Sequence, residues 1–186
     1  MRTDESQVDI CELLDEFYRE PVGHAHLANF EAVESVPAPY DKLLDHNAHM
    51  TVTVESHYGE SVDVEVHRCQ STHDSAGQKW YGREITLVTS KSRTIVQYGI
   101  VRLNVGALAP EVWKLIESQQ IPLGRALIQH NVLREVQLCG LWKVLAGTSL
   151  AGLMHRRMGD TLYGRTALIY CDGAPAIELL EIVAPV

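Results

Sequence analysis

The chain has 186 residues, 46% of them hydrophobic, and a formal net charge of −8 at pH 7. This length suits a single domain, and the hydrophobic fraction excludes an intrinsically disordered chain. The acidic balance argues against nucleic acid as a partner, and the lack of a long apolar run argues against a membrane-spanning segment.

The N-terminus and the cysteines indicate the cellular compartment. The first ten residues, MRTDESQVDI, are polar and acidic, unlike a signal peptide. Cys11, Cys69, Cys139 and Cys171 are far apart in the sequence and form no CxxC pair. We therefore expect reduced thiols in a cytoplasmic protein.

The N-terminal segment predicts a helix. Residues 6–19 place apolar side chains at helical spacing with acidic residues between them, which is typical of an amphipathic helix. Pro21 and Gly23 end this pattern. We expect a helical arm over residues 1–40 and a single globular domain over residues 41–186.

Alternation of apolar and polar residues begins at Met50. Residues 50–58 (MTVTVESHY) and 61–69 (SVDVEVHRC) alternate on either side of Gly59, which predicts a β-hairpin. Residues 80–90 and 92–103 predict two further strands, also joined by a short turn. Such paired, alternating strands favour an antiparallel sheet with one buried face.

Two proline-started segments predict helices. Pro110 precedes residues 111–120 (EVWKLIESQQ), whose apolar residues fall on one side of a helix. In residues 120–130 (QIPLGRALIQH), Pro122 suits a helix start, and Gly124 would let the backbone approach a ligand or a neighbouring strand.

The last third of the chain returns to strands. Residues 131–138 are compatible with a strand, and residues 161–171 and 174–185 flank Asp172-Gly173, a dipeptide typical of two-residue hairpin turns. About six or seven strands in hairpins with two or three helices predict an α+β domain built on an antiparallel sheet.

Two charged residues interrupt apolar strands. In a strand, Arg83 would share a face with the apolar residues Tyr81 and Ile85, and Glu181 would share one with Leu179. A charge on a buried face is costly unless it is paired or binds a ligand. The other interpretation is that Arg83 lies on an exposed strand and has no function.

The histidines do not predict a metal site. His24, His26 and Glu31 imitate part of a cupin motif, but the flanking glycines and a second downstream histidine motif are missing. The sequence also lacks a GxSxG nucleophile motif.

Four short motifs occur in an order that resembles a known family. They are LLDHNAHMTVTVE, REI, IPLGRAL and YGRTALIYCDGAPAIELLEIVAP, between Leu43 and Pro185. Their order and spacing are similar to those of the chorismate lyase (chorismate pyruvate-lyase) family. The resemblance implies an antiparallel sheet of about six strands, with helices packed on it and covering an internal ligand cavity.

The resemblance also implies an activity and a site. Family members convert chorismate to 4-hydroxybenzoate and pyruvate without metal or organic cofactor, so the chain would be a carbon–oxygen lyase acting on chorismate or a similar dianion. Arg83 would bind a substrate carboxylate, and Glu181 would hydrogen-bond the ring hydroxyl and assist proton movement; these two would be the catalytic residues. Met50 and Leu123 would contact the substrate, Leu123 through its backbone.

Departures from the family pattern leave alternatives open. Residues 97–104 (QYGIVRLN) replace an expected small-residue segment that contains an arginine and ends in proline, so that Arg102 comes late in its strand. Residues 145–157 resemble an insertion, and residues 1–40 match no part of the family. We expect these changes to alter the walls and flaps of the pocket.

The alternatives are an enzyme acting on a related chorismate-derived acid and a non-catalytic module that binds small cyclic acids. The same fold serves as the effector-binding domain of a class of bacterial transcription regulators, and fold alone does not fix function. The binding-module alternative predicts an attached helix-turn-helix, which the first forty residues do not resemble, and the presence of both Arg83 and Glu181 favours the lyase. The sequence does not predict the oligomeric state.

Overall fold

A computed structural model describes residues 8–130 and 134–184 of the chain. Its centre is one seven-stranded sheet in the order β1-β5-β6-β7-β4-β3-β2, in which every neighbouring pair is antiparallel. The strands are β1 (Ala28–Val33), β2 (Val62–His73), β3 (Lys79–Thr89), β4 (Ile95–Asn104), β5 (Arg134–Ala146), β6 (Thr161–Cys171) and β7 (Ala174–Val183).

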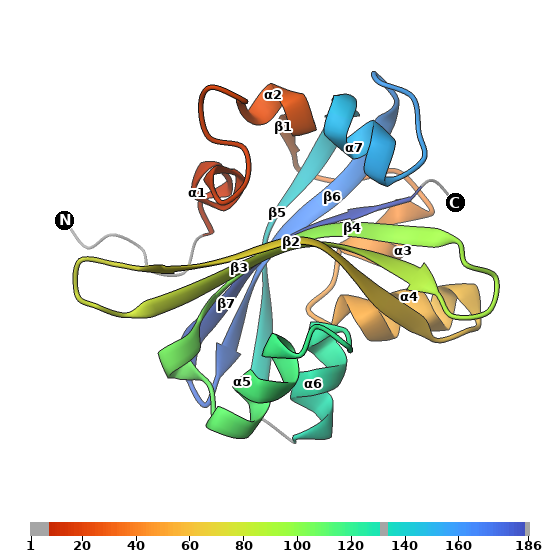
Figure 1. The fold of residues 1–186 in the computed structure, drawn as a ribbon. Coiled ribbons are helices and arrows are strands. Elements are labelled where there is room, and N and C mark those ends of the chain that lie inside the picture. Colours follow the sequence, from red (N-terminus) through yellow and green to blue (C-terminus); the bar gives the residue numbers. More distant parts are fainter. Residues whose placement is uncertain (1–7, 131–133, 185–186) are drawn as a thin grey trace.

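Helices cover both faces of the twisted sheet (Figure 1). They are α1 (Ile10–Asp15), α2 (His24–Leu27), α3 (Tyr40–Leu44), α4 (Met50–Tyr58), α5 (Pro110–Glu117), α6 (Leu123–Gln129) and α7 (Thr148–Leu153), with a 3-10 turn η1 (Val105–Ala107) after β4. The predicted α+β class with an antiparallel sheet is confirmed, with one strand more than the six expected.

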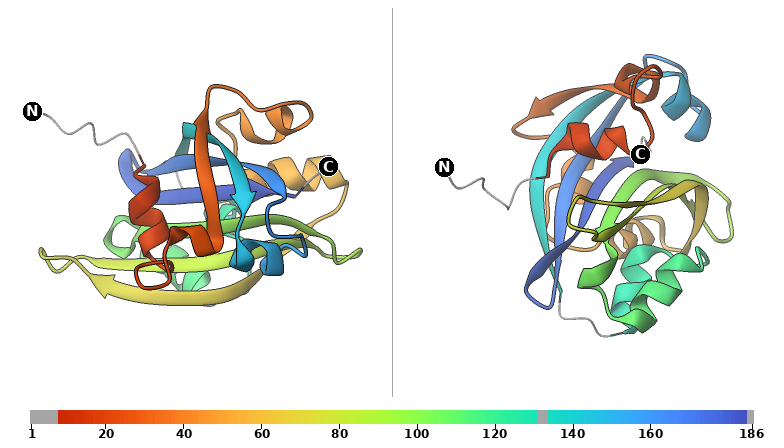
Figure 2. Two further views of the ribbon diagram at one scale, coloured as in Figure 1. Left: turned by 90° about the horizontal axis from the view of Figure 1, so that it is seen from above. Right: turned by 60° about the vertical axis from the view of Figure 1, so that its left-hand side comes forward.

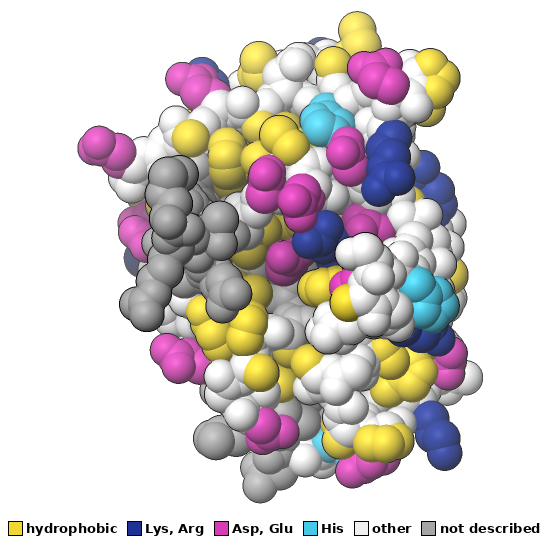
Figure 3. Space-filling model, turned by 90° about the vertical axis from the view of Figure 1, so that its left-hand side faces the viewer, with side chains coloured by type: hydrophobic (Ala, Val, Ile, Leu, Met, Phe, Trp, Pro, Cys, Tyr) yellow, Lys and Arg dark blue, Asp and Glu magenta, His cyan; other side chains and the backbone are white. Residues whose placement is uncertain are grey.

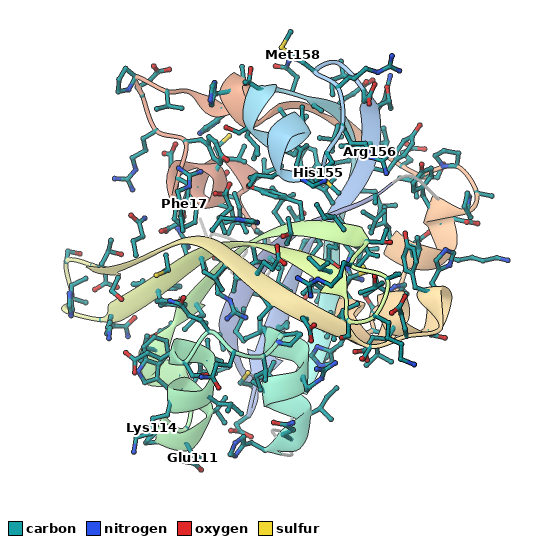
Figure 4. The ribbon with its side chains drawn as sticks, turned by 45° about the vertical axis from the view of Figure 1, so that its right-hand side comes forward. Phe17, Glu111, Lys114, His155, Arg156 and Met158 are labelled. Carbon is teal, nitrogen blue, oxygen red and sulfur yellow. The ribbon has the colours of Figure 1, made fainter. Side chains whose placement is uncertain are left out.

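The two helical layers have separate cores. Leu13 of α1 and Leu150 of α7 pack with Tyr98 of β4 on one face of the sheet. On the other face, α5 and α6 pack against β4, β6 and β7, and α3 and α4 pack beside them. Figure 2 shows the N-terminal segment and α5–α6 on opposite sides of the sheet. Figure 4 shows the same separation, with Phe17 on one side of β2–β4 and Glu111 and Lys114 of α5 on the other.

Hairpins that depend on local turn chemistry form as predicted. β3 and β4 pair with each other, and β6 pairs with β7 through Asp172 (φ 51°) and Gly173 (φ 83°). Both turn residues have positive φ, which an Asp-Gly dipeptide adopts at little cost. The helix at Pro110 also forms, with this proline at its first position.

The predicted hairpin between residues 50–58 and 61–69 is wrong. Residues 50–58 form helix α4, which buries Met50, Thr51 and Val54 and ends at Gly59 in the left-handed conformation (φ 69°). The partner of β2 is β3 instead. Burial of the first and fifth residues of α4 follows helical spacing, so tertiary packing overrode the alternation of threonine and valine.

Part of the N-terminal segment joins the sheet. β1 pairs with β5 at one edge, and α1 packs against β4 and β7. The described part of the helix predicted over residues 6–19 is the shorter α1, and residues 6 and 7 lie outside the described range. Residues 131–133 of the predicted strand over residues 131–138 are also outside it, and β5 contains the remainder. The division at residue 40 stays a prediction.

Among residues 8–130 and 134–184, no helix is long and apolar enough to cross a membrane. Acidic side chains are spread over the face that Figure 3 presents, with basic side chains between them.

Candidate functional site

A cavity lies between the sheet and the layer formed by α4 and α6. It contains about 510 Å³ of empty space, including its opening to solvent. Strands β2 to β7 contribute to its lining, and the first residues of α4 and α6 meet over it. The walls are mainly aliphatic, with contributions from Ile85, Leu87, Val101, Val136, Ile169 and Leu179.

The four site residues expected from the sequence all line this cavity. Arg83 comes from β3 and Glu181 from β7, two strands apart in the sheet. Met50 and Leu123 are the first residues of α4 and α6. The structure therefore brings them together, whereas their contacts with a ligand stay predictions.

Arg83 is a buried cation with unused hydrogen-bond donors. Its residue is 1% exposed, and its Nε and Nη1 atoms have no hydrogen-bond partner among the described residues. Burial lowers the pKa of Arg83, although nearby Tyr81 and Cys69 act in the opposite direction, and an arginine remains charged in any case. Burying an unpaired charge is costly, so this guanidinium favours an incoming anion.

Glu181, in contrast, has a permanent counter-ion. Nε of Arg165, on β6, lies 2.7 Å from Oε2 of Glu181, and Nε2 of Gln97 lies 3.5 Å from Oε1. Arg165 is 0% exposed and also donates to the backbone oxygens of His46 and Ala48 at 2.8 and 3.0 Å. It therefore ties the carboxylate to the loop that leads into α4.

His46 contributes to the same loop. Its Nδ1 lies 3.2 Å from Nη1 of Arg165, and its Nε2 lies 2.8 Å from the backbone oxygen of Leu43. Burial, together with the charge of Arg165, lowers the pKa of His46. At neutral pH we therefore expect an uncharged imidazole that accepts from Arg165 through Nδ1.

The cavity is covered by two close helix starts. A Cβ atom at Gly124 would lie 2.9 Å from Oγ1 of Thr51, so glycine is needed for α6 to approach α4. The N–H groups of the first turn of a helix have no partner within the helix. Pro122, which precedes α6, has no side-chain acceptor for them. Met50 and Leu123, the first residues of the two helices, line the cavity.

Gln97 and Arg165 line the cavity but were not among the expected site residues. Arg165 carries the signal that singled out Arg83 and Glu181, because it is a charge inside the apolar strand YGRTALIY. Gln97 shares the cavity face of β4 with Gly99 and Val101, which alternation alone indicates.

Of the departures from the family pattern, the strand QYGIVRLN does contribute to the pocket wall, through Gln97, Gly99 and Val101. The other two departures lie away from the described cavity lining. The segment resembling an insertion contains α7, whose Leu150 and Met154 pack on the opposite face of the sheet. Arg102 forms ion pairs with Glu178 and Glu12 at 2.6 and 2.9 Å, also away from the cavity lining. The cavity is bounded by the segments that carry the family-like motifs together with residues of β2, β4 and β5.

His24 and His26 lie in helix α2 rather than in a strand, and His24 pairs with Asp15 at 2.7 Å. Within the described ranges, no group of three or more histidine, cysteine, aspartate or glutamate side chains is arranged to hold a metal ion.

Comparison with solved structures identifies related folds. The effector domain of PhnF from Mycobacterium smegmatis superposes with a TM-score of 0.56 at 12% identity, covering 73% of this chain and 87% of that domain. The longer PhnF structure gives the same TM-score at 11% identity. The match covers 73% of this chain and 63% of that one. The ligand-binding domain of a Bordetella bronchiseptica protein assigned to the GntR-family transcriptional regulators gives 0.50 at 14% identity, covering 66% of this chain and 85% of that domain.

No protein-family model matches the sequence, and no curated protein matches it. The shared feature is therefore the fold, which is that of effector and ligand-binding domains of regulators.

The prediction that the chain is a chorismate pyruvate-lyase-like enzyme is wrong. The solved structures that it resembles are ligand-binding and effector domains of transcriptional regulators. In the cavity, Glu181 forms an ion pair with Arg165 at 2.7 Å. The roles of Arg83 and Glu181 toward a ligand stay predictions.

Proposed function

We propose that this protein is a non-catalytic module that binds a small organic acid in the cavity beneath α4 and α6. The observation that carries the proposal is the guanidinium of Arg83, which is 1% exposed and has two buried donors without partners among the described residues. A carboxylate matches the planar guanidinium of an arginine and would accept a hydrogen bond from an unpaired donor, although Nε and Nη1 do not belong to the same fork.

The surroundings of Arg83 support an organic anion rather than a bare inorganic ion. The walls of the cavity are aliphatic, so they favour a ligand with an apolar body. Met50 and Leu123, the first residues of α4 and α6, line the same cavity, so a bound acid would contact both helices as well as the sheet. Ligand binding would thereby join the two helices to the sheet.

Glu181 would act on the ligand through the side chains that it holds. Its Oε2 accepts from Nε of Arg165 at 2.7 Å, and its Oε1 faces Nε2 of Gln97 at 3.5 Å. The likeness to effector domains of regulators supports the use of the bound compound as a signal.

A thermal-shift screen with small carboxylic acids tests the proposal. Benzoate, 4-hydroxybenzoate, butyrate and 4-hydroxybutyrate are suitable probes, and a ligand at a hundredfold excess over its Kd should add about 2.7 kcal/mol to the free energy of unfolding. Arg83→Leu should abolish the stabilisation by these acids.

Arg157→Leu is the matched control, because the Arg157 side chain is 92% exposed and lies outside the cavity. It should respond to the acids as the wild type does. Equal stabilisation of wild type and Arg83→Leu would contradict the proposal.

A further inference from the structure

We propose that Gln97 recognises the end of the ligand remote from its carboxylate, and that the ligand is a monoanion carrying an uncharged hydrogen-bond donor. This inference rests on the proposed function, since it names the class of acid that the same cavity selects.

The orientation of the Gln97 amide is set by its neighbour. Gln97 is 3% exposed, and its Nε2 is the atom that faces the carboxylate of Glu181. Rotating the amide by 180° would place two acceptor oxygens together, so Glu181 disfavours the flipped state. Oε1 is consequently the atom left over, and it is buried with no partner among the described residues.

A buried acceptor without a donor costs about 1–3 kcal/mol, so an unpaired Oε1 at a cavity wall calls for a donor from outside the protein. Arg83 and Gln97 are thus complementary. Arg83 has donors that need an acceptor, and Gln97 has an acceptor that needs a donor. Both line the same cavity, so one molecule can satisfy both.

The distance between these two groups suits a small molecule. Arg83 is opposite Val101 in the β3–β4 ladder, four positions along β4 from Gln97, which corresponds to about 13 Å between backbone positions before the side chains extend. Gly99 lies between them on the same face. A Cβ atom there would be 3.2 Å from the backbone oxygen of Leu180, so β4 lies close to β7 at this position.

The balance of charge selects a monoanion. Three charged side chains other than histidine line the cavity, namely Arg83, Arg165 and Glu181, and their formal charges are +1, +1 and −1. Arg165 and Glu181 neutralise each other at 2.7 Å, which leaves the single positive charge of Arg83. A dianion would bury one uncompensated negative charge, and a zwitterion would leave Arg83 uncompensated.

This charge balance leads us to propose a monoanion in place of the ligand expected from the sequence. The sequence led us to expect chorismate or a similar dianion, whereas the cavity offers one unpaired cation among the described residues. The donor at the far end should therefore be neutral, such as a hydroxyl or an amide N–H.

Matched pairs of acids test the inference. Dissociation constants are measured by calorimetry for benzoate against 4-hydroxybenzoate and for butyrate against 4-hydroxybutyrate, at about pH 8, where histidine is uncharged. We expect the hydroxylated acid of at least one pair to bind about tenfold more tightly than its partner, as one buried hydrogen bond provides. The dianions terephthalate and succinate should bind more weakly than benzoate and butyrate.

Gln97→Leu should remove the preference for the hydroxylated acid while still allowing benzoate or butyrate to bind, because only the acceptor at the far end is lost. Gln70→Leu is the control, since Gln70 contacts Glu16 of the N-terminal segment rather than the cavity. It should leave the preference unchanged.

The outcomes separate the two proposals. A preference that persists in Gln97→Leu, or tighter binding of the dianions, overturns this inference alone, provided that Arg83→Leu still abolishes binding. Binding that survives Arg83→Leu overturns the proposed function, and failure of all these acids to bind at millimolar concentration contradicts both.

Discussion

Arg83 and Glu84 are neighbours in β3, and both are buried, but they differ in their hydrogen-bond partners. Each is 1% exposed, and they lie on opposite faces of the sheet. Oε1 of Glu84 accepts hydrogen bonds from the hydroxyls of Tyr18 and Tyr98, and Oε2 accepts from Nε of Arg68 at 2.7 Å. Arg83 has no partner for Nε or Nη1 among the described residues.

The difference separates a structural charge from a binding charge. Glu84 joins the segment after α1 to the sheet through Tyr18, and the guanidinium of Arg68 also stacks on the rings of Phe17 and Tyr18 at 5.0 and 4.7 Å. The partners of Glu84 all come from the chain itself. Under our proposal, the counter-charge of buried Arg83 comes from a ligand.

Glu84→Ala should have the largest effect on stability. It leaves two buried phenol hydroxyls without an acceptor and Arg68 without its carboxylate, so we expect a loss of about 3–5 kcal/mol in the free energy of unfolding, measured by urea denaturation. Glu65→Ala removes an ion pair with Arg93 whose side chains are 43% and 54% exposed, and should cost at most about 1 kcal/mol. A similar cost for both variants would contradict the structural role of Glu84.

The hydrogen-bonded cluster of Glu84 with Tyr18, Tyr98 and Arg68 should lose stability at both acidic and alkaline pH. Burial raises the pKa of the Glu84 carboxyl, but hydrogen bonds from Arg68, Tyr18 and Tyr98 outweigh it and leave the pKa below its usual 4.5. Because the pKa of Glu84 is lower in the folded state, the ionised carboxylate stabilises the fold above about pH 4.5. This stabilisation is lost as the pH falls through the pKa that Glu84 has in the folded state.

At alkaline pH, ionisation of Tyr18 should also lower the stability of the protein, in this case as the pH rises. Burial, with the nearby Glu84, raises the pKa of Tyr18 from 10.0 to about 12. The unfolded state then releases its proton first, so stability should fall by about 2–3 kcal/mol between the two pKa values. Urea denaturation as a function of pH measures this, and Tyr18→Phe should flatten the alkaline limb. An unchanged limb in Tyr18→Phe would remove Tyr18 as its cause.

Arg83→Leu should have the smallest effect on the protein without ligand, although it abolishes binding. Removing an unpaired buried charge relieves its desolvation, so we expect the free energy of unfolding to stay constant or to rise by about 1–2 kcal/mol. Urea denaturation without added acid measures it. A loss comparable to that of Glu84→Ala would indicate that Arg83 has a structural partner and would remove the contrast between the two residues.

Much of the sheet could be predicted from local sequence, because its turns depend on a few neighbouring residues. The β6–β7 hairpin follows from Asp172-Gly173, and Pro110 marks the start of α5. The segment 50–58 could not be assigned in this way, since its threonines and valines suit a strand and its helix is stabilised by contacts with α3, α6 and β2.

The site was predictable in part for a similar reason. Arg83 and Glu181 stand out as charges in apolar strands, and so does Arg165, which we did not single out. No local pattern indicates that Arg165 pairs with Glu181 while Arg83 has no partner for two of its donors among the described residues. The strands that carry these charges become neighbours only through the order β6-β7-β4-β3.

The amino-acid sequence by itself determined that this protein has an antiparallel sheet, that charged residues interrupt its strands, and that α6 begins after Pro122. Only the tertiary structure decided which of those charges are satisfied. The partners of Glu84 include Tyr18, 66 residues away, and Arg165 reaches backbone oxygens more than 110 residues away. Partners that distant are set by packing of the whole chain, and that packing leaves polar atoms of Arg83 and Gln97 without a hydrogen-bond partner among the described residues.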